Sequence, residues 1–519
     1  MGGTTMEHSK ARIIVCISAL LIIGFAASHP SWSMPGSGAS PTILEKKTLE
    51  RWPDPVVADC GIFSSLVGKR IEFIRVYACS EGSLRPIPFQ IDEKDSKGHY
   101  IYPSGEKPTG KEANGLLDKG EELVFMARDS GSRVGPEGLP PGIELWEELE
   151  LVDPLTQAKG WVYLLYSESN PPPPSQEDYI QYTPVATCPG EGDCQIMKSK
   201  YMEDHFYPLA PYFDMSKQKG KGFAHMYMAN PPEAGGTGVD YVDRFKGRIT
   251  MAFLFGSLKL HFDEGSVTFY EAAYKDGAVR LVRNLQIIIH LPLGIKAPGF
   301  AVDLIWYDTI VDVPMVIDLP FNPKYVLSYL ELKIGEDHAP GAIGMRVYTS
   351  NNLKGCLVDG KTEEDAETNW NTERDQWRLI TGKQGTCMNR SFWDERYLKQ
   401  MKWIKVQYID DVTKPDPPED DPGMLGMILQ TNRVEGIKKD RYFSYLEWYW
   451  PPSFLFTGPD HTYRVGDEKA YLNIADHPVK LTAGKNSMES HYFGKMPSYD
   501  RAEAVIEKAR EEGAPQPQK

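Results

Sequence analysis

The sequence predicts an all-β protein made of two antiparallel β-sandwich domains, followed by a C-terminal extension that ends in a helix. Apolar and polar residues alternate at period two in residues 258–262, 285–291 and 326–334, which is the pattern of strands with one buried face. The 40 prolines and 46 glycines divide the chain into short apolar runs. No repeated alternation of strand and helix patterns is evident, which argues against a parallel α/β sheet.

Individual elements follow from local patterns. Residues 123–127 are continuously apolar, and so are residues 249–255 apart from Thr250, as expected of strands that are buried on both faces. Asp276 and Gly277 form a hairpin signal. Near the C-terminus, Asp500 and Glu503 form a capping box ahead of an apolar stripe that ends before Gly513, which predicts a helix.

Prolines mark the expected domain boundary. Residues 171–174 are four consecutive prolines, which form a stiff, extended spacer. We therefore expect a first sandwich domain over residues 34–169, a larger sandwich domain over 176–459, and the extension over 460–519.

The first 33 residues have the three parts of a secretory signal peptide. Lys10 and Arg12 precede an apolar run over residues 13–27, and Ser31 and Ser33 offer small side chains for cleavage. The run is short for a membrane span. We expect export to the periplasm or the cell surface, with no transmembrane span left after cleavage. The alternative is a retained N-terminal anchor.

The charge balance excludes one class of partner. The chain has 57 Lys and Arg residues against 72 Asp and Glu residues, a formal net charge of −15. Nucleic-acid binders usually carry a basic surface instead. We therefore expect no nucleic-acid partner.

The cysteines predict three disulfides. Six cysteines remain after the signal peptide, an even number that favours disulfides in an exported chain. Fifteen connectivities are possible for six cysteines. Nearest-neighbour pairing closes three local loops, and it predicts the bonds Cys60–Cys79, Cys188–Cys194 and Cys356–Cys387.

Two acidic segments in the first domain suggest a calcium site. The segments are residues 84–98 and 118–131, and each combines a strand-like run with acidic residues at its ends. Converging oxygen ligands could bind Ca²⁺, the one cofactor that the sequence suggests. The alternative is that the aspartates make turns with their own backbone. The candidate ligands are Gln90, Asp92, Asp95, Asp118, Glu122 and Asp129.

The same two segments carry a resemblance to known proteins. Residues 86–92 read P-I-P-F-Q-I-D, and residues 118–127 read D-K-G-E-E-L-V-F-M-A. This pattern resembles the N-terminal β-sandwich of exported bacterial proteins, some of which are associated with polysaccharide breakdown. The resemblance covers residues 55–133, and Arg85 departs from the small or apolar residue common there. It implies a fold and a compartment, and no catalytic residue.

An aromatic strand supplies the candidate ligand site. Residues 442–452 are the densest aromatic segment, and on a strand Trp448 and Trp450 share one face. Flat aromatic faces beside carboxylates suit sugar rings. We expect Trp448 and Trp450 to stack on a ligand, with Glu447 or His261 as the polar partner. The alternative is that both indoles belong to the core.

These patterns favour an exported protein that binds or processes a carbohydrate, with a polysaccharide as its partner. The alternative is a non-enzymatic scaffold that docks another protein of the cell envelope. The sequence contains no G-x-S-x-G, H-E-x-x-H, P-loop or G-x-G-x-x-G motif, so it specifies no reaction.

Overall fold

The computed structural model describes part of the 519-residue chain. The chain divides into two units, residues 1–39 and 40–519, and every described residue belongs to the second. The predicted signal peptide and C-terminal helix lie outside the described residues. The described residues are 41–188, 192–206, 226–242, 244–253, 256–262, 267–289, 300–318, 322, 325, 327–350, 352–361, 367–369, 376–393, 403–409, 424–431, 441–458 and 463–491.

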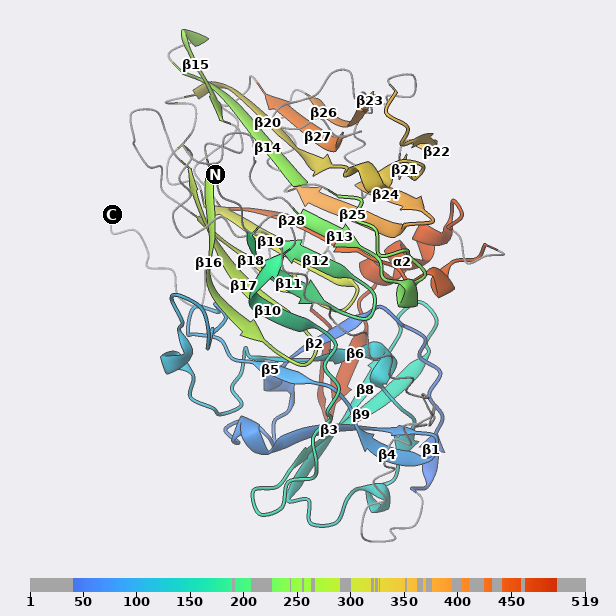
Figure 1. Cartoon of the computed structure of the whole chain (residues 1–519). Coiled ribbons are helices and arrows are strands. Elements are labelled where there is room, and N and C mark those ends of the chain that lie inside the picture. Colours follow the sequence, from blue (N-terminus) through green and yellow to red (C-terminus); the bar gives the residue numbers. More distant parts are fainter. Residues whose placement is uncertain are drawn as a thin grey trace, which may run out of the picture. The chain divides into compact units, whose positions relative to one another are not determined.

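The described part of the chain is built from antiparallel strands, which confirms the all-β prediction (Figure 1). Its one α-helix of regular length is α2 (Asp467–Asp476). No helix among the described residues is long and apolar enough to cross a membrane.

The first region of the chain forms a sandwich of two sheets, with a small separate pair of strands, β1 (Ile43–Glu45) and β7 (Arg133–Val134). The three-stranded sheet has the order β2 (Pro55–Asp59), β6 (Glu122–Met126), β5 (Gln90–Asp92). The six-stranded sheet has the order β30 (Asn486–Glu489), β29 (Lys480–Ala483), β8 (Leu145–Val152), β9 (Lys159–Tyr166), β3 (Ile74–Ser80), β4 (Ser83–Pro86).

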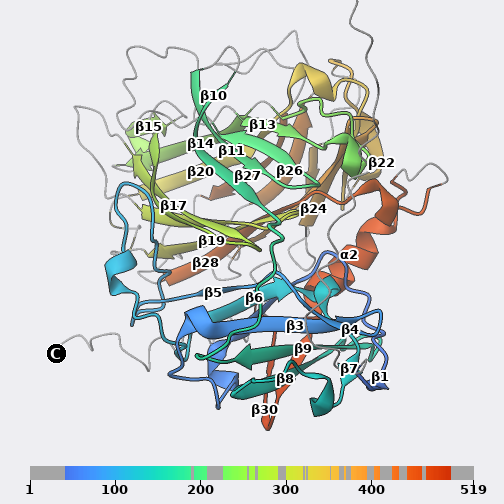
Figure 2. The same cartoon turned by 60° about the horizontal axis from the view of Figure 1, so that its bottom comes forward.

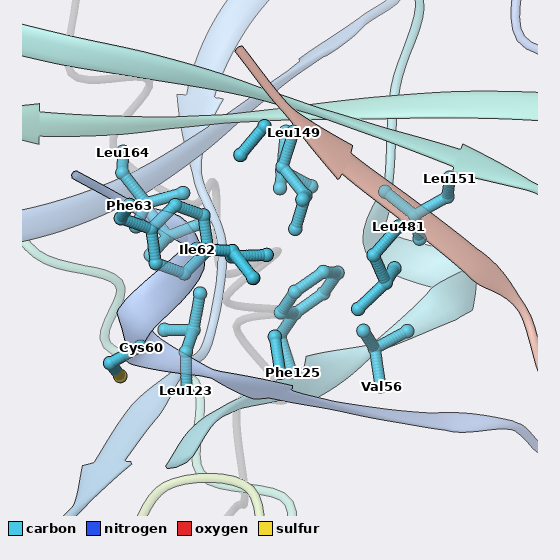
Figure 3. Packing of buried hydrophobic residues seen from close by; sticks show 14 of the residues in the cluster. Val56, Cys60, Ile62, Phe63, Leu123, Phe125, Leu149, Leu151, Leu164 and Leu481 are labelled. Atoms are coloured by element: carbon cyan, nitrogen blue, oxygen red, sulfur yellow. The ribbon is translucent and has the colours of Figure 1, made fainter. Parts of the chain in front are cut away.

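An apolar core fills the space between these two sheets (Figure 3). Phe125 of β6 meets Leu149 and Leu151 of β8, and Leu481 of β29 packs beside them. Thus the C-terminal part of the chain returns to the first region and completes its sheet, because β29 pairs with β8 and β30 pairs with β29. Figure 2 shows β30 in this region. The extension predicted for residues 460–519 therefore contains two strands of the first sandwich.

Three further sheets form the second region. The four-stranded sheet has the order β10 (Gln181–Cys188), β11 (Gly192–Lys198), β12 (Glu203–Phe206), β13 (Met226–Ala229). The six-stranded sheet has the order β15 (Leu258–Phe262), β14 (Arg244–Phe253), β20 (Leu327–Asp337), β27 (Met424–Thr431), β26 (Trp403–Ile409), β23 (Glu367–Asn369). The nine-stranded sheet has the order β16 (Val267–Asp276), β17 (Leu281–Ile289), β18 (Phe300–Trp306), β19 (Ile310–Asp318), β28 (Arg441–Tyr449), β25 (Gly385–Trp393), β24 (Gln376–Gly382), β21 (Arg346–Thr349), β22 (Asn352–Leu357).

The nine-stranded sheet is covered on both faces. One face shares a core with residues of the other two sheets of the second region, including Met197 and Tyr408. The other face packs on the three-stranded sheet, where Val57 and Val124 meet Ile305. Strand β6 is therefore buried on both faces, as its continuous apolar run predicts. This shared core bridges the domain break predicted at residues 171–174.

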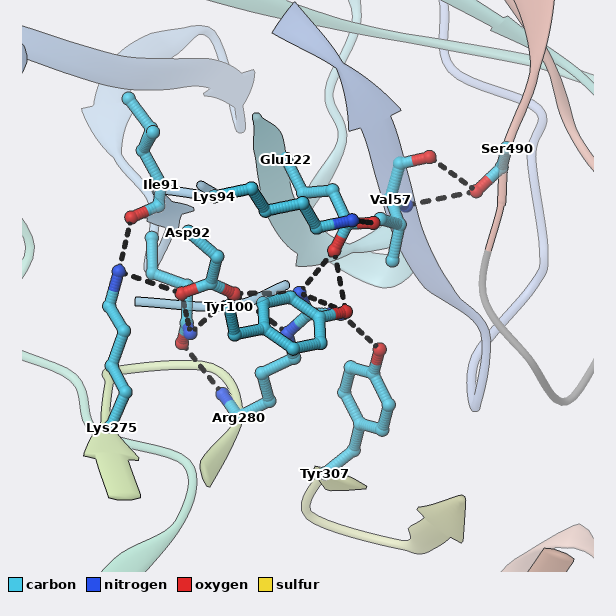
Figure 4. Close-up of polar contacts among 11 residues, drawn as sticks. Val57, Ile91, Asp92, Lys94, Tyr100, Glu122, Lys275, Arg280, Tyr307 and Ser490 are labelled. Atoms are coloured by element: carbon cyan, nitrogen blue, oxygen red, sulfur yellow. Dashed lines mark hydrogen bonds and ion pairs between the residues drawn. The ribbon is translucent and has the colours of Figure 1, made fainter. Parts of the chain in front are cut away.

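Ion pairs cross the same boundary (Figure 4). Asp92 of β5 is fully buried and binds Lys275 Nζ at 2.9 Å and Arg280 Nη2 at 2.7 Å. Arg280 also binds Glu122 at 2.6 Å, and Lys94 pairs with Glu122 from the other side. Burial alone would raise the pKa of Asp92, but Lys275 and Arg280 outweigh it and lower that pKa.

Two of the three predicted disulfides are wrong. Cys60 and Cys79 are free, because alternation along β3 turns Cys79 away from the core that holds Cys60. Cys356 and Cys387 are also free. They lie on β22 and β25 with β21 and β24 between them, roughly 14 Å apart by strand spacing. A disulfide needs Cα atoms within about 7 Å.

The third predicted disulfide remains a prediction. Cys194 is buried and disulfide-bonded. The side chain of Cys188, its predicted partner, lies outside the described residues, although its backbone sits on β10 beside β11.

Candidate functional site

The candidate site begins where the buried strand β6 ends. The chain turns through a short 3₁₀ helix, η4 (Ala127–Asp129), which brings Arg128 and Asp129 out of the core to a half-buried position. Gly131 then crosses the backbone of Cys79 so closely that a Cβ atom would lie 2.3 Å from the Cys79 carbonyl oxygen. Only glycine fits this crossing, which fixes the path of the loop.

The loop lines one lobe of a two-lobed depression that we call the Arg128 cleft. The first lobe has a volume of about 410 Å³ and includes residues 85–88 and 128–132. The second has a volume of about 430 Å³ and includes Tyr179, Lys200, Tyr201 and Asp308. Arg128 and Glu177 line both lobes. The two acidic segments of the sequence, residues 84–98 and 118–131, thus both contribute to this cleft: the first through its N-terminal end and the second through its C-terminal end.

Arg128 is the central cation of the cleft. Its Nη2 atom lies 2.5 Å from Oδ2 of buried Asp308. Its guanidinium lies 4.8 Å from the centre of the Trp52 ring and 4.6 Å from the centre of the Tyr179 ring. Burial would lower the pKa of Arg128, but the charge of Asp308 outweighs it and raises that pKa. The guanidinium is therefore fixed in place and permanently charged.

Asp129 and Tyr179 form the polar pair of the cleft. The Tyr179 hydroxyl donates a hydrogen bond to Asp129 Oδ1 at 2.9 Å, and it also lies 3.4 Å from Glu177 Oε2. The buried Oδ2 atom of Asp129 has no hydrogen-bond partner among the described residues. Burial raises the pKa of Asp129 to about 6, against the opposing effects of Arg128 and Tyr179.

The predicted aromatic platform is part of the core. Trp450 is 1% exposed and belongs to the core of the second region, and Trp448 packs against that core from a partly buried position. The Trp448 indole N–H donates to Glu336. Trp448 and Trp450 therefore do share one face, as predicted, but this face packs on the core of the second region and is not open to solvent.

The predicted polar partners also lie away from any ligand platform. Glu447 is 1% exposed and accepts hydrogen bonds from the hydroxyls of Tyr445 and Tyr471. It also lies 3.8 Å from Arg390, so it serves a buried polar cluster. His261 is exposed on edge strand β15 and lies 3.0 Å from Thr250. The structure does not bring His261 to the Trp448 strand, because β15 and β28 belong to different sheets.

The six candidate calcium ligands are not gathered in one cluster. Gln90 donates to Asp92, whose charge is matched by Lys275 and Arg280. Glu122 pairs with the same Arg280 as Asp92, so cationic side chains, and not a metal ion, neutralise these two carboxylates. Among the described residues no group of three or more His, Cys, Asp or Glu side chains could hold a metal ion.

The remaining three candidates have separate local roles. Asp95 accepts hydrogen bonds from the backbone N–H groups of Lys97 and His99, the turn that the sequence offered as the alternative. Asp118 accepts from the Asn114 side chain at 2.7 Å. Asp129 belongs to the Arg128 cleft.

Sequence reasoning missed most residues of the cleft. Asp129 was identified, although for another role, but Arg128, Glu177, Tyr179 and Asp308 were not. The available signal was a charged pair directly after a buried run, at residues 128 and 129. Asp308 lies 180 residues beyond Arg128, so no local pattern could join them.

Comparisons with known proteins give limited similarity. No family model matches the chain, and a search of curated proteins found no match. An alpha-mannosidase from Enterococcus faecalis V583 aligns at 8% identity and a TM-score of 0.38, over 88% of this chain and 46% of the mannosidase. The chain thus spans less than half of that protein.

A second solved structure is similar over part of the chain. It is a galactose mutarotase-like protein from Clostridium acetobutylicum, at 9% identity and a TM-score of 0.31, over 53% of this chain and 99% of that protein. At these TM-scores the similarity is slight, and it assigns no activity to this chain.

Proposed function

We propose that this protein binds a carbohydrate in the Arg128 cleft. The observation that carries the proposal is the lining of the cleft, which combines tyrosine rings with carboxylates and fixed cations. Tyr179 is half-buried between Arg128 and the carboxylates of Asp129 and Glu177. Sugars need both kinds of contact, since their C–H faces pack on rings while their hydroxyls bond to charged and amide groups.

The charge of the cleft favours a neutral sugar. Although the chain as a whole is acidic, the acidic and basic side chains of the two lobes nearly balance. The cations are Lys47, Arg85, Arg128 and Lys200, and the carboxylates are Glu81, Asp129, Glu177, Asp178 and Asp308. Each lobe also falls within the volume range of small-ligand sites, about 300–1,000 Å³.

Asp129 acts in this proposal as a positioning residue. Its Oδ1 atom accepts the Tyr179 hydroxyl, which holds the ring beside the Arg128 guanidinium. The exposed carboxylate of Glu177 and the exposed ammonium of Lys200 are left at the rim to meet ligand hydroxyls.

The test is a glycan-array screen of the mature protein, with and without Ca²⁺. We expect wild type to retain a neutral glycan and Tyr179→Ala to lose it. Tyr325→Ala is the matched control, since Tyr325 is 77% exposed and lines neither lobe. Thermal unfolding of each variant separates loss of the site from loss of the fold. Equal retention by a folded Tyr179→Ala variant would refute the proposed site.

We also propose that the protein is exported. Support comes from the basic residues Lys10 and Arg12 followed by a short apolar run and small residues at 31 and 33. Cell fractionation followed by N-terminal sequencing is the test. A mature protein that begins near residue 34 outside the cytoplasm is expected, and an intact N-terminus in the cytoplasm would reject export.

A further inference from the structure

A second, smaller cavity lies at the end of β28, beside α2, and we call it the Trp52 pocket. Its volume is about 150 Å³. Its aromatic lining consists of Trp52, Tyr449, Phe456, Tyr463 and Tyr471. Proline, leucine and methionine side chains complete the apolar wall.

The charge of this pocket is one-sided. Three carboxylates line it, from Glu50, Asp467 and Glu468, and its lining includes no lysine or arginine. Glu50 is exposed at the rim, whereas Glu468 is 5% exposed. The pocket therefore differs from the Arg128 cleft, where cations and carboxylates nearly balance.

The polar atoms of the pocket are largely engaged with the protein itself. The Tyr463 hydroxyl donates to Glu468 at 2.7 Å, and the Tyr471 hydroxyl donates to Glu447. Asp467 accepts from the Thr457 hydroxyl at 2.6 Å and from the Arg464 N–H at 2.8 Å. A sugar would find few groups left to bond its hydroxyls. A ligand that needs no hydrogen bonds suits the pocket better.

From this combination we propose that the Trp52 pocket binds a small organic cation of the quaternary ammonium type. Such a cation is attracted to aromatic faces and to carboxylates at short range, and it has no N–H group to satisfy. Aromatic rings, three carboxylates with no lysine or arginine in the lining, and a small volume are all present in this pocket. The pocket neighbours the Arg128 cleft, since the Arg128 guanidinium lies 4.8 Å from the centre of the Trp52 ring, but the two sites have no lining residue in common.

Isothermal titration calorimetry of the full chain with choline tests the proposal. The matched ligand is the neutral isostere of choline in which carbon replaces the quaternary nitrogen. We expect choline to bind and the isostere to bind at least about tenfold more weakly, since it keeps the shape and loses the charge. Absence of choline binding, or equal binding of the isostere, would overturn the proposal.

The variant Glu50→Gln locates the cation. It removes one charge at an exposed rim position, so we expect about three- to tenfold weaker choline binding without a change in melting temperature. Glu112→Gln is the matched control, because Glu112 is exposed and lines none of the three cavities described. Equal affinity in the Glu50→Gln variant and the control would contradict the assignment.

The Tyr179→Ala variant separates the two sites. Tyr179 lines the Arg128 cleft and does not line the Trp52 pocket. Choline binding is expected to persist in this variant, whatever happens to glycan retention. Loss of choline binding in a folded Tyr179→Ala protein would place the cation in the Arg128 cleft and overturn the proposal.

Discussion

For Asp92, the sequence correctly predicts the face on which the side chain lies but not its role, which is to pair with Lys275 and Arg280. An acidic residue two positions after Gln90 does place both side chains on one face of β5. The sequence could not show that the cations facing them come from Lys275 and Arg280, more than 180 residues away. Burial then favours this ion pairing, because a fully buried carboxylate stays charged only beside a charge partner.

Arg280 is predicted to be the residue on which this ionic network depends most. Replacing it by Met leaves Asp92 and Glu122 near the boundary of the two regions with one cation fewer. We expect a loss of about 3–5 kcal/mol in the free energy of unfolding, measured by urea denaturation. Arg280→Lys keeps the charge and is expected to lose less. A loss below about 1 kcal/mol for Arg280→Met would show that the network is dispensable.

Asp129 is predicted to make stability depend on pH. Its pKa in the folded protein is about 6, above its ordinary value of 3.8. The protonated group therefore favours folding fully below about pH 4, and this contribution is lost as the pH rises through 6. The stability of wild type relative to Asp129→Asn should fall by about 2–3 kcal/mol between pH 4 and pH 7. Parallel pH profiles of the two proteins in urea denaturation would disprove the raised pKa.

At the scale of elements, the period-two pattern predicts which side chains share a face of a strand. It does not predict whether another sheet covers that face. The alternation along β28 correctly separates Trp448, which packs on the core of the second region, from Glu447, which accepts a hydrogen bond from Tyr471 of the core on the other face. It cannot reveal that sheets cover both faces, since coverage depends on strands distant in sequence. The sequence also does not predict that β29 and β30 return to the first region. Each strand is only four residues long, which is too short for a clear alternating pattern.

Leu481 of β29 provides the test of that return. It is fully buried in the core of the first sandwich, between elements more than 300 residues earlier in the chain. Leu481→Ala should cost about 2–5 kcal/mol in the free energy of unfolding. The control is Lys480→Ala, since Lys480 is exposed on the same strand. Equal stability of the two variants would mean that β29 is not part of this core.

At the scale of the whole molecule, the sequence predicts the fold class. It does not predict which distant segments contact one another. Short apolar runs between prolines and glycines sufficed to predict antiparallel strands. Two of the three predicted disulfides are wrong because nearest-neighbour pairing ignores the strand face that a cysteine occupies, as Cys79 shows, and the strands that lie between two cysteines, as Cys356 and Cys387 show. The Arg128 cleft was only partly predictable, since Arg128 and Asp308 meet through tertiary structure alone.

The free cysteines lead to a chemical prediction. Alkylation of the denatured, unreduced protein followed by peptide mapping should label Cys60, Cys79, Cys356 and Cys387, and should leave Cys194 unlabelled. The native protein should react slowly, because all four thiols are buried. A disulfide joining any two of these four residues would contradict the structure.

Hydrogen–deuterium exchange with a glycan retained on the array tests whether a carbohydrate binds in the Arg128 cleft, because it reports where the ligand lies. We expect protection on binding in residues 128–132, 177–179 and 200–201, which line the Arg128 cleft. Tyr179→Ala should lose this protection. Protection confined to residues 258–262 or 448–450, with no change around Arg128, would contradict it.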